Sequence, residues 1–553
     1  PQVTFIAADT FQGRKPGFKF LKGSKGIGYY YDRIQVAQSV NTSTASDLSH
    51  EVFKLHEIIP SASKPSIEEM LEEAEATGMV QLDPFSLKQL LLSIEKKITK
   101  NQKMRMKFAD EPTKFMDSEV ELHTEIQELY AIAASPELYP VLVQAGAVPS
   151  LLGCLAHENT DISIAVIGLL QEMTEVDTIS DELQDAIVLI DAFRESQGFE
   201  LVVQNLSRLD ESNEEDAQGV QQSLAIIENL VEIDSSNAVY VCEKTHILKY
   251  LLERCRIKAF DANKLYCSEI LSILLQADER VPLLLSALRE LDGVEALLQC
   301  IALYRKKEVT AADEQECVEN LFLSLCATLQ PRSNQQMFLD CEGFELLLRC
   351  LKEQQYVAGC TIPALNYAVL RNKACCAHLV DVGGMKYVFP LLTGGGMKKA
   401  LKRKGSGEKR HLEESALSIV AQLCCWLGQG EGVEKESYPL RILNKLSERE
   451  QEKLERCVEL YGRYSRLLEA TDDEIERTRE ALAQADDQEA LEDFEDEDNI
   501  YGQRLEGGLF NLQQVSMIIA YACVFDPVCR KKAELRLATE SATLEDVLTT
   551  LRD

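Results

Sequence analysis

The sequence lacks the residue spacings that mark most metal-binding and catalytic proteins. No C-x-x-C pair occurs among its 17 cysteines, and its 7 histidines are scattered, so no zinc-site spacing is present. It contains no phosphate-binding G-x-x-x-x-G-K-[ST], no G-x-S-x-G and no H-E-x-x-H motif. These absences predict a protein that is not an enzyme and that uses no metal or cofactor.

Long apolar runs and positive charge are also scarce. No uninterrupted run reaches the roughly 18 apolar residues that a membrane span needs, and the nearest, Phe510 to Phe525, is broken by polar residues. The chain has 58 basic and 91 acidic residues, so its formal net charge is 58 − 91 = −33. Because no apolar run is long enough, we expect no membrane partner. Because such a surface repels phosphates, we expect no direct nucleic acid for the repeat region and basic peptide segments as partners.

The cysteines do not form the pattern of a disulfide framework. Many lie inside apolar helical runs, as Cys154, Cys267, Cys326 and Cys424 do. A cysteine in such a run usually serves as a small buried hydrophobic side chain. The cysteines are therefore predicted to be reduced, as in an intracellular protein.

From about residue 84 the sequence has helical periodicity almost without interruption. Leu87, Leu90, Leu91, Ile94 and Ile98 recur at three- and four-residue spacing, which is the stripe of an amphipathic helix. No alternating strand pattern is visible in this region. The fold class is therefore predicted to be all-α.

A short apolar phrase that begins near a glycine recurs along the chain. Its glycines are residues 146, 198, 293, 343 and 384, and the longest interval contains a copy without the glycine at 245–252. The period is about 41 to 52 residues, as in helical-repeat solenoids. We expect each glycine to end a short helix in a left-handed turn.

Most copies continue into a second, longer apolar helix. These helices are predicted at 162–173, 220–231, 265–275 and 318–329. One repeat cannot bury its own apolar side, so the core forms only when neighbouring repeats stack. The sequence therefore predicts an α-solenoid.

Several long ungapped phrases resemble the catenin-beta-like protein family. The resemblance runs from about residue 84 to about residue 545, and its phrases are 107–120, 159–166, 169–173, 201–212, 260–271 and 504–513. It implies an armadillo superhelix with extra N-terminal helices and a helical C-terminal domain. It further implies a nuclear protein without catalytic activity that associates with the NineTeen-type splicing complex and binds basic, nuclear-localisation-like segments of splicing factors.

The domain organisation expected from these patterns has seven parts. They are a basic, glycine- and aromatic-rich segment (1–40), non-helical or flexible; a linker with a short acidic helix (41–83); an N-terminal helical cap (84–140); armadillo-type repeats (141–430); a helical segment (431–470); an acidic linker (471–499); and a C-terminal helical unit (500–553). The glycines and the proline of residues 1–40 favour turns or a short hairpin. This segment is a docking or RNA-contacting module, a flexible tail, or a piece joined by a wrong gene model.

The peptide-binding residues are predicted from the inner helices that line an armadillo groove. Aligning these helices places Glu172, Asn229, Ser272 and Ser324 in equivalent positions, so only one repeat keeps an asparagine that can hold a peptide backbone. Binding must therefore depend on charge, through carboxylates that attract lysine and arginine. The predicted groove residues are Glu172, Glu228, Asn229, Glu232, Asn263, Glu269, Glu316, Glu319 and Asn320. The competing interpretation is that these carboxylates are only the solvated sides of helices.

A basic run lies between two glycine-rich stretches, 394–396 and 405–407. Its charged residues are Lys398, Lys399, Lys402, Arg403 and Lys404. The run resembles a nuclear-localisation signal, although plain surface loops have the same composition. The expected location is the nucleus. Two functions stay open, a splicing scaffold and an import or chaperone-like adaptor that uses the same groove, and so does homo-oligomer formation.

Overall fold

The protein divides into two compact units, Pro1–Gln81 and Leu82–Asp553. The computed structural model describes three strands in the first unit. In the second unit it describes residues 82–176, 183–277, 288, 291–395, 405–428, 437–485 and 494–552.

The first unit contains a small antiparallel sheet with strand order β1-β3-β2. Its strands are β1 (Phe5–Ala7), β2 (Phe18–Gly23) and β3 (Gly26–Tyr31). Gly23 pairs with Gly26, so β2 and β3 form an antiparallel hairpin with two residues between them. The hairpin expected in this segment is therefore present. The short acidic helix predicted within residues 41–83 lies outside the described residues.

The second unit begins with the helices expected as an N-terminal cap. They are α3 (Pro84–Lys107), α4 (Met116–Leu129) and α5 (Tyr139–Gln144), with short 3-10 turns η1 (Pro112–Lys114), η2 (Tyr130–Ala134) and η3 (Pro136–Leu138) between them. α3 starts where it does because the Asp83 carboxylate accepts a hydrogen bond from the Ser86 amide at 2.7 Å. Leu87, Leu91 and Ile94 are buried, as the predicted stripe requires.

The repeats follow the cap, and each repeat is a set of helices of which the last is the longest. Their elements are α6 (Ala147–Gly153), η4 (Cys154–Ala156) and α7 (Thr160–Met173); α9 (Leu183–Glu195), α10 (Gly198–Leu206) and α11 (Glu214–Ile233); α12 (Ser236–Lys244), α13 (Ile247–Arg256) and α14 (Ala262–Leu274); α16 (Gly293–Tyr304) and α17 (Ala312–Thr328); α18 (Arg332–Asp340), α19 (Gly343–Glu353) and α20 (Ala358–Val369); and α21 (Lys373–Asp381), α22 (Met385–Leu392) and α24 (Ser406–Leu427).

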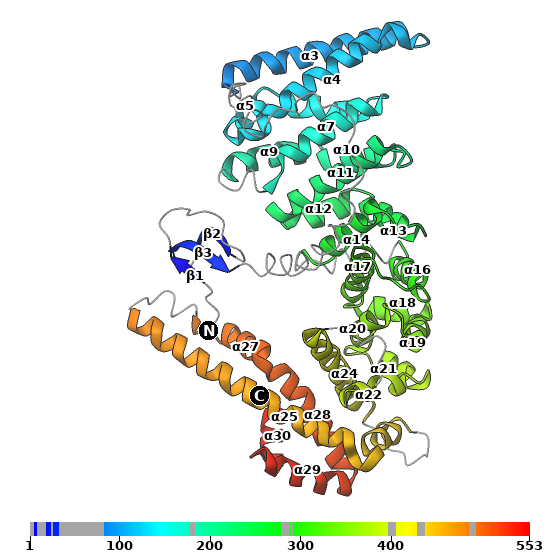
Figure 1. Cartoon of the computed structure of the whole chain (residues 1–553), viewed down its shortest axis with the longest axis vertical. Helices are drawn as coiled ribbons and strands as arrows, with labels where there is room; N and C mark the ends of the chain where they lie inside the picture. The colour runs from blue at the N-terminus through cyan, green and yellow to red at the C-terminus, as the bar shows by residue number, and fades with distance from the viewer. Residues whose placement is uncertain are drawn as a thin grey trace, which may run out of the picture. The chain divides into compact units, whose positions relative to one another are not determined.

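The last helices of successive repeats stack directly on one another. α4 packs on α7, and the series continues through α11, α14, α17, α20 and α24, each helix contacting the next (Figure 1). Fully buried residues such as Leu224, Ile227, Leu271 and Leu321 fill the space between them. No strand occurs among the described residues of this unit. The predicted all-α armadillo-type solenoid is confirmed, and the small sheet of the first unit is an addition to it.

Three of the long helices, α7, α11 and α14, begin earlier than their apolar residues indicate, because polar caps start them. The side chain of Asn159 accepts from the Asp161 amide at 3.0 Å, and that of Asp261 accepts from the Lys264 amide at 2.9 Å. Asn213 caps α11 in the same way. These residues satisfy amides that would otherwise lack a partner at the helix start. The predicted helices are thus confirmed but extended at their N-terminal ends.

The left-handed residue of each repeat is not always the glycine, which corrects the expectation from the sequence. Of the five predicted glycines only Gly146 is itself left-handed, with φ of 72°. In the other four copies the residue before the glycine takes this conformation: Gln197, Asp292, Glu342 and Gly383, with φ of 58°, 51°, 55° and 81°. The glycine itself then opens the next helix.

Close packing explains why glycine is needed at that next position. A Cβ on Gly343 would lie 2.4 Å from the ring of Phe338, and one on Gly198 would lie 2.6 Å from the ring of Phe193. Each glycine thus makes room for a large side chain five residues earlier. Ala147, which opens α6, is therefore the residue equivalent to Gly198, and the repeat register shifts by one position there.

The C-terminal part of the second unit contains one long helix and a small group packed on it. Its elements are α25 (Tyr438–Ala485), α27 (Glu497–Arg504), the π-helical turn η5 (Leu505–Leu509), α28 (Phe510–Phe525), α29 (Pro527–Thr539) and α30 (Leu544–Thr550). α25 is broken at Glu448–Gln451, where three consecutive residues are left-handed.

The prediction of an acidic linker from residue 471 is wrong for its first half. α25 continues to Ala485. Ile475 in this stretch is buried, and the Asp472 carboxylate accepts from the Arg504 guanidinium at 2.9 Å. One buried apolar contact and ion pairs along the helix are enough to keep glutamate-rich sequence helical, since glutamate itself is a good helix former.

The apolar helix α28 has the burial of a core helix. By length and composition, the helical stretch Glu497–Phe525 is capable of crossing a membrane, and 56% of its most apolar window is buried. α28 packs on α24, α25 and α29. Val515, Ile518 and Ile519 are fully buried, and Gln514 donates to Ser418 of α24 at 3.3 Å. Packing within the unit thus accounts for its apolar residues.

Candidate peptide-binding face

The exposed sides of α7, α11, α14 and α17 form a face without an exposed cation, which we call the acidic face. These four helices contain one basic residue, Lys264. Lys264 is fully buried: its Nζ donates to the Ile257 carbonyl at 2.6 Å and lies 5.2 Å from the centre of the Tyr304 ring. The free charges on the four helices are therefore all negative.

Three predicted carboxylates come together on this face from three consecutive helices. Glu228 lies on α11, Glu269 on α14 and Glu316 on α17. Burial raises the pKa of Glu269 above its ordinary value, and the charges of Glu228 and Glu316 raise this pKa further. A carboxylate whose charge raises the pKa of another carboxyl group lies close enough to repel it. We call these three residues the carboxylate cluster.

Tyrosines from the next repeat hold two of the predicted carboxylates. Tyr266 Oη donates to Glu228 Oε2 at 2.5 Å, and Tyr356 Oη donates to Glu319 Oε1 at 2.5 Å. Burial is the main reason that the pKa of both tyrosines is raised, and the bonded glutamates add to it. Because the phenol stays protonated, it acts as a donor that fixes the carboxylate position.

The remaining predicted acids, Glu172 and Glu232, lie at the C-terminal ends of α7 and α11. Both are exposed. Burial raises the pKa of Tyr130 to about 12, and the charge of Glu172 contributes to that rise. Glu172 is therefore close to the cap helices, at the edge of the acidic face.

The predicted asparagines join repeats to one another. Asn229 is buried and its Nδ2 donates to Thr174 Oγ1 at 3.4 Å, while Asn320 Nδ2 donates to Ser268 Oγ at 3.5 Å. Asn263 is also buried, and its Nδ2 donates to Glu211 Oε2 at 2.8 Å and to the Ala217 carbonyl at 2.9 Å. Both amide hydrogens of Asn263 are thus used within the protein, which removes it from the surface that a peptide can contact.

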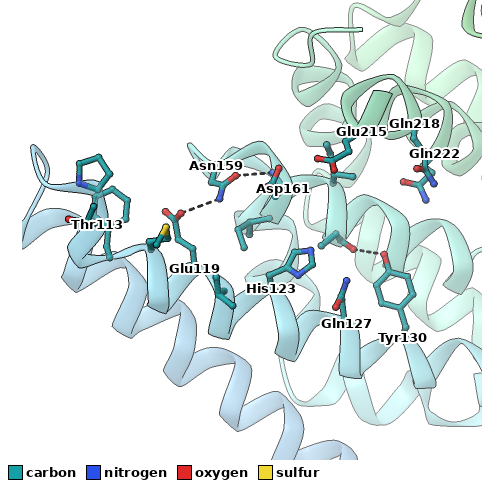
Figure 2. A pocket seen from close by; sticks show the side chains of 17 residues that line it. Thr113, Glu119, His123, Gln127, Tyr130, Asn159, Asp161, Glu215, Gln218 and Gln222 are labelled. Atoms are coloured by element: carbon teal, nitrogen blue, oxygen red, sulfur yellow. Dashed lines mark hydrogen bonds between the residues drawn. The ribbon is translucent and has the colours of Figure 1, made fainter. Parts of the chain in front are cut away.

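A groove of about 850 Å³ lies beside the acidic face and was not predicted from the sequence. It is formed by α4, α7 and α11 (Figure 2). Its lining combines polar side chains with apolar ones: Pro112, Thr113, Phe115, Met116, Glu119, Val120, His123, Gln127, Tyr130, Asn159, Asp161, Ile162, Ile164, Ala165, Glu215, Gln218 and Gln222.

A glycine inside α7 allows the groove to form. A Cβ on Gly168 would lie 2.2 Å from Tyr130 Oη and 3.2 Å from Gln222 Nε2. With glycine there, Tyr130 crosses α7 and donates to the Ala165 carbonyl at 2.9 Å (Figure 2). A glycine in the middle of an otherwise apolar helix was the one sequence signal of this close approach.

The basic run predicted as a nuclear-localisation signal lies outside the described residues. Lys398, Lys399, Lys402, Arg403 and Lys404 fall between α22 and α24, in the undescribed stretch 396–404. Their role stays a prediction from the sequence.

Stacked helical repeats with an open, negatively charged face define an armadillo-type scaffold for protein interactions. Comparison with known families gives the particular family. The model of the family described as "Catenin-beta-like, Arm-motif containing nuclear" matches residues 65–552, and the chain belongs to this family. The resemblance seen in the sequence is therefore confirmed.

Curated relatives match over most of their length. The chain is 40% identical to "Beta-catenin-like protein 1" from Homo sapiens over 445 residues, which is 80% of this chain and 76% of the relative. The Rattus norvegicus protein of the same name gives the same identity and coverage. The Schizosaccharomyces pombe protein named "Beta-catenin-like protein 1 homolog" is 29% identical over 496 residues, covering 89% of this chain and 82% of the relative.

Proposed function

We propose that this protein is a non-enzymatic scaffold of the pre-mRNA splicing machinery that binds basic, nuclear-localisation-like segments of partner proteins on the acidic face. The observation that carries the proposal is the absence of any exposed cation from α7, α11, α14 and α17, together with the carboxylate cluster across them. Association with a NineTeen-type complex is what the family resemblance adds.

The cluster is suited to a cationic ligand because Glu228 and Glu316 both repel the charge of Glu269 when the face is empty. A lysine or arginine side chain placed between Glu228, Glu269 and Glu316 replaces this repulsion with attraction. Charge-assisted hydrogen bonds to ionised carboxylates are stronger than neutral ones. The long-range negative field also raises the rate at which a basic segment meets the face.

A titration with peptides tests the binding function. A fluorescent peptide with four consecutive lysine or arginine residues is expected to bind, and the same peptide with glutamine at those positions is not. The affinity should fall steeply as salt is added, because exposed charge pairs are screened over about 8 Å at physiological ionic strength. Equal binding of the two peptides at low salt would contradict the proposal.

The assignment to splicing competes with a role as an import or chaperone-like adaptor on the same face. Purification of the tagged chain from nuclear extract distinguishes the two. We expect splicing proteins and small nuclear RNAs to accompany it. Import receptors without splicing components would favour the adaptor.

A nuclear location is part of the proposal. The description of the family includes the word nuclear, and the run from Lys398 to Lys404 is a candidate signal in this chain. Microscopy of a fluorescent fusion tests the location directly, and a fusion excluded from the nucleus would contradict it.

A further inference from the structure

The groove over α4, α7 and α11 differs chemically from the acidic face beside it. Glu119, its most buried acid, forms a salt bridge with Arg105 and accepts from Asn159 Nδ2 at 3.1 Å. Its charge is therefore balanced within the protein. Met116 and Val120 are 54% and 61% exposed, which leaves two large apolar side chains open to a ligand.

Three glutamine side chains in the groove are available to hold an extended backbone. Gln127 lies on α4, while Gln218 and Gln222 lie on α11 across the groove (Figure 2). Within the described residues none of the three side-chain amides makes a hydrogen bond. Each amide can donate and accept at once, which matches the alternating groups of a peptide backbone.

The groove is continuous with the acidic face through α11. Glu215, Gln218 and Gln222 line the groove from the first half of this helix, and Glu228 and Glu232 of the acidic face lie in its second half. A segment bound to the carboxylate cluster can therefore extend into the groove without leaving the surface of the protein.

We propose that the groove binds an uncharged, extended flank of the basic segment itself, with one apolar side chain placed against Met116 and Val120. This inference rests on the proposed function and names a second feature of the partner. Asp161 and Glu215, both exposed in the groove, disfavour an acidic flank.

The stacking of the helices gives the distance between the groove and the carboxylate cluster. The groove is centred on α7 and the carboxylate cluster on α14, two helix intervals apart. Packed helices lie about 8–10 Å apart, and an extended chain covers about 3.3–3.6 Å per residue. The apolar residue should thus be separated from the basic cluster by a spacer of about five residues.

A set of three peptides tests this. The first carries a leucine, a five-residue glycine–serine spacer and four basic residues; the second replaces leucine with serine; the third shortens the spacer to one residue. Anisotropy titrations should give at least about fivefold tighter binding for the first than for the other two, because a buried leucine adds apolar contact.

Matched protein variants locate the effect. Met116→Ser with Val120→Ser should abolish the preference for leucine while leaving the affinity for the serine peptide unchanged. Val528→Ser with Leu535→Ser, which removes two equally exposed apolar side chains on α29 (62% and 68% exposed), should keep the preference. Gln218→Ala with Gln222→Ala should weaken the binding of both peptides that have the five-residue spacer.

The outcomes separate the two proposals. If the basic peptides bind but leucine and serine peptides bind equally, the groove proposal is overturned and the proposed function stands. If no basic peptide binds, both fail. If light scattering shows a dimer that Met116→Ser with Val120→Ser dissociates, the groove holds a second copy of the chain and the proposal is again overturned.

Discussion

Tyr266 on α14 donates its hydroxyl hydrogen to the Glu228 carboxylate on α11, with 2.5 Å between the oxygens. The same arrangement recurs between Tyr356 and Glu319 two repeats further along. In each case a half-buried phenol from a later element fixes a carboxylate on the acidic face. The bond therefore couples the stacking of repeats to the position of a charge that we propose to bind cations.

Removing this hydroxyl should affect stability more than binding. Tyr266→Phe keeps the ring and the carboxylate but loses a hydrogen bond to a charged group, which is expected to cost about 1–2 kcal/mol of unfolding free energy. The affinity for a basic peptide should change by less than about threefold, since the charge of Glu228 remains. Thermal unfolding and anisotropy measure the two effects, and a large loss of affinity with unchanged stability would contradict this role.

Glu269 should make the protein less stable at neutral pH than it would be with a neutral side chain. Its pKa is raised above the ordinary 4.5 by burial and by Glu228 and Glu316. The folded state thus binds a proton more tightly than the unfolded state, and the stability falls as pH rises from 4.5 through the folded-state pKa. Glu269→Gln should raise the melting temperature at pH 7, and the gain should disappear below about pH 4.5.

The same substitution should weaken binding of a basic peptide, because it removes the central charge of the cluster. A stabilised variant with reduced affinity is the expected combination for a residue kept for function. Glu253→Gln, an exposed glutamate on α13, is the matched control and should change neither property. A loss of stability in Glu269→Gln at pH 7 would contradict the assignment.

The repeat glycines should be intolerant of a methyl group because of the aromatic ring in front of them. Gly343→Ala places a Cβ 2.4 Å from the Phe338 ring and should destabilise the protein by about 1–3 kcal/mol. Gly407→Ala in α24, where a Cβ meets nothing within 4 Å, should be neutral or stabilising by about 1 kcal/mol. In a Phe338→Ala background the cost of Gly343→Ala should largely vanish. A double variant whose loss of stability equals the sum of the losses of the two single variants would contradict the explanation.

The basic run between α22 and α24 is expected to contribute to nuclear import. A fluorescent fusion in which Lys398, Lys399, Lys402, Arg403 and Lys404 are alanine should accumulate in the nucleus less than the unchanged fusion. Replacing Lys306 and Lys307, which lie on another surface segment, serves as a control for lost charge. A five-alanine fusion that stays fully nuclear would remove the run from the account.

Much of the fold could be predicted because it follows from two patterns in the sequence, the helical period of the apolar residues and one repeat length. The stripe from Leu87 to Ile98 and the apolar runs of α7, α11, α14 and α17 are local patterns, so their helices were found. The extra first turns depend on caps such as Asn159 and Asp261, which are also visible in the sequence. The left-handed positions Gln197, Asp292 and Glu342 were missed because glycine is the usual choice there.

The candidate site was only partly predictable because it depends on which helices become neighbours. The carboxylate cluster follows from helix position and charge, and sequence reasoning found Glu228, Glu269 and Glu316. The partners Tyr266 and Tyr356 and the internal bonds of Asn263 arise from contacts between repeats. The groove was missed because α4 was assigned to a cap, whereas it also forms one wall of a binding surface.

The most direct test of the central claim is charge reversal on the acidic face. Glu228→Lys with Glu232→Lys should reduce the affinity for a four-lysine peptide by at least about tenfold at low salt, with the chain still folded by circular dichroism. Glu243→Lys with Glu253→Lys makes the same change in net charge on α12 and α13, where both residues are exposed, and should leave the affinity within about twofold. Equal affinities of the two variants would contradict the account.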